Sequence, residues 1–117
     1  MGRYRMGMVM VIIKRFEIFF VQLDPTKGHE IKKTRPCIVI SPDELNSALN
    51  TVIIAPLTST IRPYPTRVLC TLEDKEGNIV LEQIRTIDKS RLRKKISTLN
   101  TEDSNKVLDV LSQMFSK

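Results

Sequence analysis

The sequence has few of the residues from which metal centres and disulfide frameworks are built. Its 117 residues include two cysteines and one histidine. Cys37 and Cys70 lack the spacing of metal ligands and are too few for a disulfide framework, so we interpret both as buried thiols in a reducing compartment. Because His29 stands alone and no cluster of spaced carboxylates accompanies it, we do not expect a metal site.

Further absences exclude other classes of function. No glycine-rich phosphate loop is present, and acyl transfer would require His29 to find a nucleophile and an orienting acid for which there is no local signature. The uncharged run from Met6 to Ile13 is too short to span a bilayer, and no small-residue cleavage site follows it. We therefore expect a cytoplasmic protein without a cofactor.

Length and composition indicate a single domain with one modest core. The chain is 41% hydrophobic and contains no internal repeat, linker or low-complexity block. We assign residues 14–117 to this domain and residues 1–13 to an N-terminal extension or added strand. The net charge of +6 is compatible with a polyanionic partner, although charge alone bears on association and not on mechanism.

The apolar pattern predicts several short strands, in "EIFFVQLDP", "CIVIS", "TVIIAPL", "TRVLCTLE" and "NIVLEQIRTI". The last two are expected to be joined through a turn in "DKEGN". A short helix is expected after "CIVIS", with Ser41 as its cap, Pro42 at its first position and Glu44 completing a capping box. Thr101 is expected to cap a C-terminal helix with an apolar stripe formed by Val107, Leu108, Leu111, Met114 and Phe115.

Short strands closed by one helix predict an α+β, mainly β fold built on a small, strongly curved sheet or barrel. Polar side chains gather at its strand edges in three segments, residues 29–35, 57–59 and 82–86. Arginine, threonine and glutamate suffice for one metal-free reaction on RNA, in which the ribose 2′-OH attacks its neighbouring phosphate. A base must then accept the 2′ proton, donors must stabilise the charge on the phosphate, and the leaving 5′-oxygen must be protonated.

Taken singly, these residues have simpler interpretations. Arg35 alone is more often a surface or ion-pair residue, and Thr58 alone is most often a strand-end hydroxyl. The run "KSRLRKK", with five cations in seven residues, could form merely a solvated face.

Taken together, "DPTKGHE", "TRPCIVIS", "VIIAPLTS", "PTRV" and "VLEQIRTIDKSRL" resemble the MazF/PemK-like toxin endoribonucleases in order and spacing. The resemblance extends from about Lys14 to about Leu99, with a compatible helix beyond. It implies an SH3-like barrel of the CcdB/MazF type that forms a homodimer and is inhibited by an antitoxin with an acidic tail. It also implies metal-independent cleavage of single-stranded RNA at short sequences, leaving a 2′,3′-cyclic phosphate and a 5′-hydroxyl.

The same resemblance implies roles for particular residues. Arg35 and Thr58 match the family's catalytic arginine and threonine. Glu30 matches a loop carboxylate implicated in some members, and Glu82 falls where one branch has a catalytic aspartate; which of the two is the general base stays open. The residues expected to bind RNA are Lys32, Lys33, Ser59, Gln83 and Arg85.

The chain departs from the family pattern at three places. Arg15-Phe16-Glu17 replaces a common Arg-Gly-Asp or Arg-Gly-Glu, and Lys33 stands where glycine is frequent. Val80 stands where the aspartate-using branch has a contributing arginine. This last departure favours Arg35 as the main phosphate-stabilising group.

Two other classes of function stay open at this point. The same fold is used by CcdB-like toxins, which inhibit DNA gyrase without enzymatic activity and would use C-terminal residues. A barrel that binds RNA without cutting it is the third class. Arg35, Thr58 and the "QIRT" run favour the ribonuclease.

Overall fold

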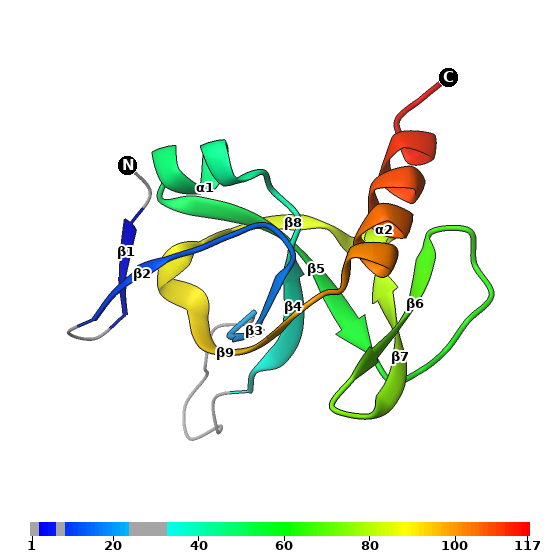
Figure 1. The fold of residues 1–117 in the computed structure, drawn as a ribbon, viewed down its shortest axis with the longest axis horizontal. Helices are drawn as coiled ribbons and strands as arrows, with labels where there is room; N and C mark the ends of the chain where they lie inside the picture. The colour runs from blue at the N-terminus through cyan, green and yellow to red at the C-terminus, as the bar shows by residue number, and fades with distance from the viewer. Residues whose placement is uncertain (1–2, 7–8, 24–32) are drawn as a thin grey trace.

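The computed structural model describes residues 3–6, 9–23 and 33–117. In these ranges the chain forms antiparallel strands and two α-helices (Figure 1). The strands are β1 (Arg3–Met6), β2 (Val9–Ile12), β3 (Glu17–Val21), β4 (Arg35–Val39), β5 (Thr51–Thr58), β6 (Arg67–Leu72), β7 (Lys75–Val80), β8 (Arg85–Asp88) and β9 (Leu92–Thr98). The helices are α1 (Asp43–Ala48) and α2 (Thr101–Met114). The expected mainly β class with a C-terminal helix is confirmed.

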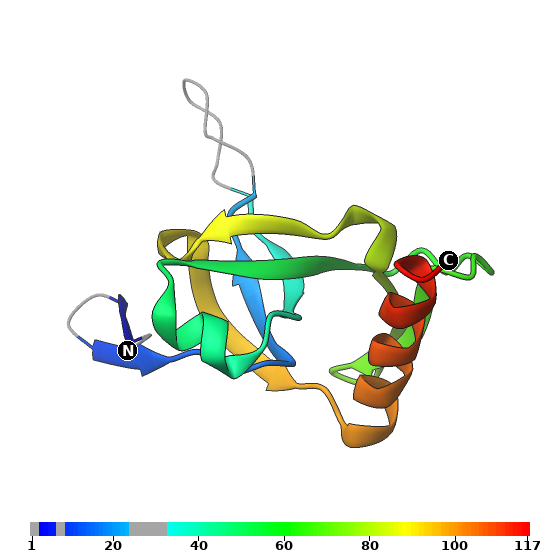
Figure 2. The same cartoon turned by 90° about the horizontal axis from the view of Figure 1, so that it is seen from above.

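Strand β5 is the centre of the main sheet. It pairs with β4 along one edge, while its other edge is shared by β8, opposite residues 51–54, and by β7, opposite Leu57 and Thr58. The strand order is β6-β7-β5-β4-β3-β9, with β8 off this path. Strands β8 and β7, which share one edge of β5, diverge from each other. The sheet curls into a half-barrel around β5 (Figures 1 and 2).

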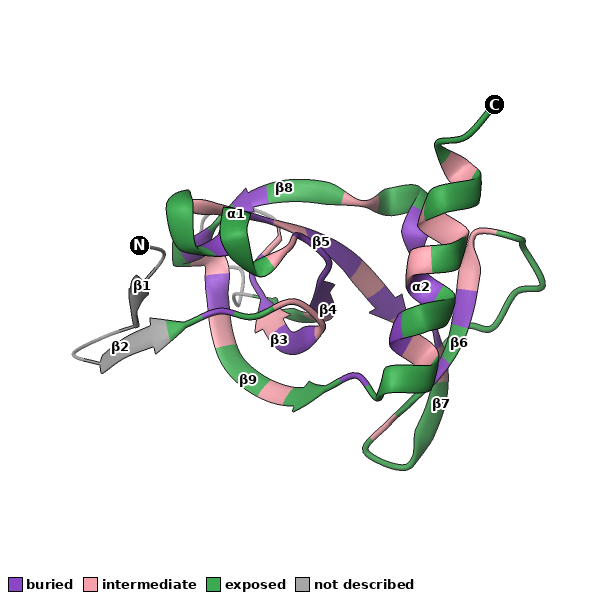
Figure 3. Cartoon of the chain, turned by 45° about the horizontal axis from the view of Figure 1, so that its top comes forward, coloured by how far each residue is buried: buried purple, intermediate pink, exposed green. Residues whose placement is uncertain are grey.

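The curled sheet is apolar on both faces. Successive residues of a strand point to opposite faces, so Ile18 and Ile38 belong to one buried cluster while Phe19, Cys37 and Val39 belong to the other. Helix α2 covers the first cluster, into which it places the fully buried Val107 (Figure 3). Both clusters fix the strands whose ends carry the polar residues of interest.

Helix α1 begins one residue later than the sequence predicts. Pro42 is its N-cap and makes no side-chain capping bond. Ser41 is not the cap, because its hydroxyl instead donates to Asn46 Oδ1 at 2.5 Å and accepts the backbone N–H of Ile53 at 3.0 Å. These two bonds tie the helix to β5. They use the buried hydroxyl of Ser41, which therefore does not cap the helix.

Helix α2 is also capped one residue from the predicted position. The side chain of Asn100 accepts the backbone N–H of Asp103, and Thr101 is the first helical residue. Of the predicted apolar stripe, Val107 is fully buried, whereas Phe115 lies past the helix and is 72% exposed. Neither of the two helices in the described ranges is long and apolar enough to cross a membrane.

The hairpin between β6 and β7 turns earlier than "DKEGN" predicts. Its central residues are Glu73 and Asp74, both with positive φ (50° and 65°), as a tight two-residue hairpin turn requires. The predicted strand "NIVLEQIRTI" is divided into β7, the 3₁₀ turn Leu81–Gln83 and β8. Gly77 therefore lies within β7 and not in the turn.

The cationic run 89–95 is more than a solvated face. Lys89 is 3% exposed, and its Nζ donates to a backbone carbonyl of α1. Arg91 donates to two backbone carbonyls that follow β3, and Lys95 pairs with Glu17 at 2.7 Å. The run holds α1 and the end of β3 in place.

The segment assigned to the extension, residues 1–13, contains β1 and β2. These strands pair with each other in a two-stranded sheet, with Arg3 opposite Ile12 and Met6 opposite Val9. The strands described for the main sheet begin with β3.

Gly77 approaches the backbone of β5 so closely that a side chain cannot fit. A Cβ atom at Gly77 would lie 2.6 Å from the carbonyl oxygen of Thr58. We predict that Gly77→Ala destabilises the protein by about 1–3 kcal/mol, because the backbone at Thr58 must move. The exposed neighbour substitution Glu76→Ala serves as the control. Equal melting temperatures for the two variants would show that β5 tolerates the displacement.

Candidate functional site

The strand register brings the two principal predicted residues together. The β4–β5 register ends with Cys37 opposite Pro56, and Arg35 and Thr58 each lie two residues beyond this last pair on their own strands. Both residues line two adjacent clefts, of about 470 Å³ and about 450 Å³. Residues 23 positions apart in the sequence therefore meet at one end of the β4–β5 pair.

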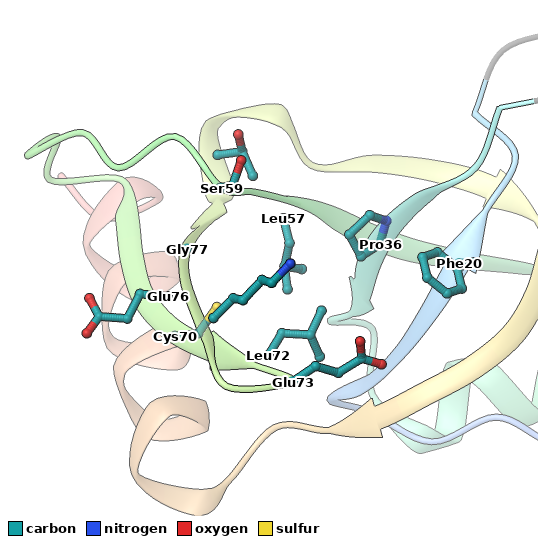
Figure 4. Close-up of a pocket in the computed structure, with 11 residues that line it drawn as sticks. Phe20, Pro36, Leu57, Ser59, Cys70, Leu72, Glu73, Glu76 and Gly77 are labelled. Carbon is teal, nitrogen blue, oxygen red and sulfur yellow. The ribbon is translucent and has the colours of Figure 1, made fainter.

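A third, apolar pocket of about 250 Å³ adjoins the same place (Figure 4). Its wall includes Pro36, Leu57 and Leu72, and Figure 4 shows Glu76 directed away from it. Thr58 lines this pocket as well as both clefts. A ligand that carries both polar and apolar groups would contact Thr58.

Arg35 presents a positive charge where the two polar clefts meet. It is exposed at the first position of β4 and has no carboxylate partner among the residues in the described ranges. Burial raises the pKa of the neighbouring Cys37 thiol to about 12, and the charges of Arg85 and Arg35 oppose that rise. Arg85 therefore lies near the same thiol, and Cys37 itself, as a neutral thiol, is no nucleophile.

Glu82 is held in a bidentate ion pair with Arg67. Arg67 Nε lies 2.9 Å from Glu82 Oε2 and Nη2 lies 2.7 Å from the same oxygen, while Thr66 Oγ1 donates to Oε1 at 2.8 Å. The hydrogen bonds from Arg67, supported by the one from Thr66, lower the pKa of Glu82 to about 2. A carboxylate this acidic is a poor general base near neutral pH. The geometry instead suits Glu82 to holding the Arg67 guanidinium in place.

Sequence reasoning did not single out Arg67, Arg62 or Tyr64, all of which line the 470 Å³ cleft. The guanidinium of Arg67 lies 5.0 Å from the centroid of the Tyr64 ring. In the strand register Arg67 is the partner of Val80, so a guanidinium stands on the strand beside that valine. The available signal was the "PTRV" motif, but the pairing with Glu82 spans 15 residues and is visible only in the fold.

Three of the remaining predicted residues line one or other of the two clefts. Gln83 lines the 470 Å³ cleft, and Lys33 and Ser59 line the 450 Å³ cleft. Glu30 and Lys32 lie outside the described residues. Within the ranges that the structure describes, no three His, Cys, Asp or Glu side chains gather closely enough to hold a metal ion.

A curled antiparallel sheet with an exposed cation in clefts at one end of its central strands defines a small, mainly β domain with a candidate anion-binding site. The model of the family described as "PemK-like, MazF-like toxin of type II toxin-antitoxin system" matches residues 14–115. The chain belongs to this family.

Individual relatives agree with this membership. Endoribonuclease EndoA of Bacillus subtilis (strain 168) is 38% identical over 107 residues, which cover 86% of this chain and 92% of that protein. A mycobacterial endoribonuclease solved in complex with its cognate antitoxin has the same fold, with a TM-score of 0.73 and 22% identity over 86% of this chain and 92% of that one. MazF from Deinococcus radiodurans does too, with a TM-score of 0.72 and 22% identity over 89% and 96% of the two chains.

The ion pair of Glu82 makes stability depend on pH in a defined direction. Because its folded-state pKa is about 2, below the ordinary 4.5, the ionised carboxylate stabilises the fold above about pH 4.5, and this contribution is lost as the pH falls toward 2. We predict that the melting temperature of wild type exceeds that of Glu82→Gln at pH 7 and that the gap closes between pH 4.5 and 2.

Glu102→Gln is the matched control, since Glu102 forms an exposed pair with Lys106 at 3.7 Å. Its melting temperature should differ little from that of wild type across this range. A gap for Glu82→Gln that stays constant from pH 7 to pH 2 would contradict the assignment.

Proposed function

We propose that this protein is a toxin endoribonuclease that cuts single-stranded RNA, including messenger RNA, at short sequences and is inhibited by a cognate antitoxin. The observation that carries the proposal is that Arg35 and Thr58 line the same two polar clefts, and that Thr58 also lines the adjoining apolar pocket. Membership of the toxin family and the 38% identity to an endoribonuclease support it.

In the proposed reaction the substrate supplies its own nucleophile. The 2′-oxygen attacks the adjacent phosphorus, and the bond from phosphorus to the 5′-oxygen breaks while that oxygen takes up a proton from solvent. The products are a 2′,3′-cyclic phosphate and a 5′-hydroxyl. Negative charge develops on the non-bridging oxygens, toward which Arg35 donates hydrogen bonds from a planar, permanently charged group. The hydroxyl of Thr58 holds the same phosphate. Such a step requires no metal ligand.

Proton removal from the 2′-OH requires a base, for which two carboxylates were predicted. Since Glu82 is committed to Arg67 and has a pKa of about 2, we assign its contribution to positioning. Glu30, outside the described residues, is then the proposed base.

The residues around the junction provide the binding surface for the RNA chain. Lys33 and Ser59 line the cleft on one side of Thr58, and Gln83 lines the cleft on the other. Together with Lys32 and Arg85 they are proposed to bind phosphates and bases on either side of the cut. Phosphate contacts of this kind release counterions, so affinity should fall as salt rises.

We also propose a homodimer and an antitoxin whose acidic segment competes with RNA for the same clefts. The exposed cations Lys33 and Arg35 both line the 450 Å³ cleft and would attract such a segment. The solved mycobacterial endoribonuclease in complex with its cognate antitoxin supports the existence of such a partner.

The CcdB-like alternative is not favoured, because the family match spans residues 14–115 and the curated relative is an endoribonuclease. An RNA-binding domain without activity is separated from the enzyme by incubating the purified protein with a long mixed RNA and mapping any cut ends.

Arg35→Ala should lower the single-turnover cleavage rate by roughly a hundred- to a thousand-fold, the usual effect of losing one preorganised donor. Arg35→Lys should not restore the rate, because a point charge cannot reproduce the fork of two donors. Lys33→Ala is the control, since it removes a neighbouring exposed cation that we assign to binding. The assay is cleavage of a fluorogenic oligonucleotide with circular dichroism on each variant. Near-normal cleavage by folded Arg35→Ala would refute its role.

Cleavage should be unaffected by excess EDTA, because the proposed step uses only side chains and the substrate's own hydroxyl. The comparison is the initial rate with and without chelator, followed by addition of Mg²⁺. Activity that disappeared in EDTA and returned with Mg²⁺ would replace this mechanism with a metal-dependent one.

A further inference from the structure

The guanidinium of Arg67 has one edge engaged and one edge available. Glu82 accepts from Nε and from one N–H of Nη2, which together form the side edge of the group. The end edge, formed by Nη1 and the second N–H of Nη2, makes no hydrogen bond to any residue in the described part of the chain. Two parallel donors therefore remain on a residue that lines the 470 Å³ cleft.

This guanidinium is fixed in place before any ligand arrives. Glu82 holds it through a bidentate pair, and Thr66 holds Glu82 in turn. The ring of Tyr64 lies 5.0 Å from the guanidinium, and the Arg67 side chain is only 11% exposed. A donor pair with so little freedom can select a ligand by shape, because little conformational entropy remains to be lost.

Charge distinguishes Arg67 from Arg35, although both line the same cleft. The Glu82 carboxylate neutralises Arg67, whereas Arg35 has no carboxylate partner among the described residues. A neutralised guanidinium attracts a phosphate weakly but still donates well to neutral oxygen and nitrogen acceptors. Arg35 is suited to the phosphate and Arg67 to a base.

We propose that Arg67, held by Glu82 and Tyr64, is a specificity-determining residue that reads one base of the RNA. Two parallel donors match a base with two adjacent acceptors. Guanine offers N7 and O6, the pair that arginine most often contacts, and cytosine offers N3 and O2. On their Watson–Crick and Hoogsteen edges, adenine and uracil place a donor beside each acceptor, so they are rejected at this position. This inference rests on the proposed ribonuclease function and names part of its sequence preference.

The test is to map the cleavage motif of wild type and of Arg67→Met on a long mixed RNA. Wild type should show one position where guanine or cytosine is required. In Arg67→Met the discrimination against adenine and uracil at that position alone should fall roughly ten- to a hundred-fold. Lys106→Met, which breaks an exposed ion pair on α2, should leave the motif unchanged.

Two outcomes would overturn the inference. One is a wild-type motif without any guanine or cytosine position. The other is an Arg67→Met variant that is uniformly slower with the same motif, which would place Arg67 in the chemistry instead. Arg67→Lys guards against a folding defect, because it keeps a cation for Glu82 while removing the two-donor edge, and it should relax the same position.

Failure of the proposed function gives a different result. If wild type cut no RNA, sequences bound from a random-sequence RNA pool would still report on Arg67. Enrichment of guanine or cytosine at one position by wild type and not by Arg67→Met would sustain base reading without cleavage. Equal enrichment by both proteins would refute it.

Discussion

The pairing of β4 with β5 is the constraint on which the candidate site depends. It brings the start of β4, which carries Arg35, beside the end of β5, which carries Thr58, and the second edge of β5 is paired as well, with β8 and β7. The close approach of Gly77 to the Thr58 carbonyl fixes the end of β5 from the other side. The backbone hydrogen bonds of these strands, together with the two apolar clusters packed on the sheet, thus hold the main chain at Arg35 and at Thr58 in place. The site can be rigid although both side chains reach the surface.

Two arginines line the same cleft, but in the described part of the chain only one of them is paired with a carboxylate. Arg35 keeps its charge, which suits a group whose negative charge increases during the reaction. Arg67 shares its charge with Glu82 in a pair whose carboxylate has a pKa of about 2. In this account Glu82 affects which base is recognised, because it holds the guanidinium of Arg67. Val80 itself carries no charge, and the guanidinium beside it comes from its β6 partner, Arg67.

Much of the fold could be predicted from the sequence, because short runs of apolar and β-branched residues and a capped amphipathic helix leave strong local signals. Helix caps were misplaced by one residue, since Ser41 has a stronger partner in Asn46 and Asn100 competes with Thr101. A common site for Arg35 and Thr58 was implied by the family resemblance, and the antiparallel pairing of β4 with β5 brings the strand ends that carry them together. The roles of Lys89 and Arg67 could not be foreseen, because their partners are 43 and 15 residues away in the sequence.

The central claim is that Arg35 and Thr58 act as one unit on the scissile phosphate. A double-mutant cycle on the single-turnover cleavage rate tests it most directly, using Arg35→Lys, Thr58→Val and the double variant on one oligonucleotide at saturating protein. Groups that act together are strongly non-additive. The account predicts that the double variant is about as slow as Arg35→Lys alone. Two effects that multiply fully would contradict it and would show that the two residues contribute independently.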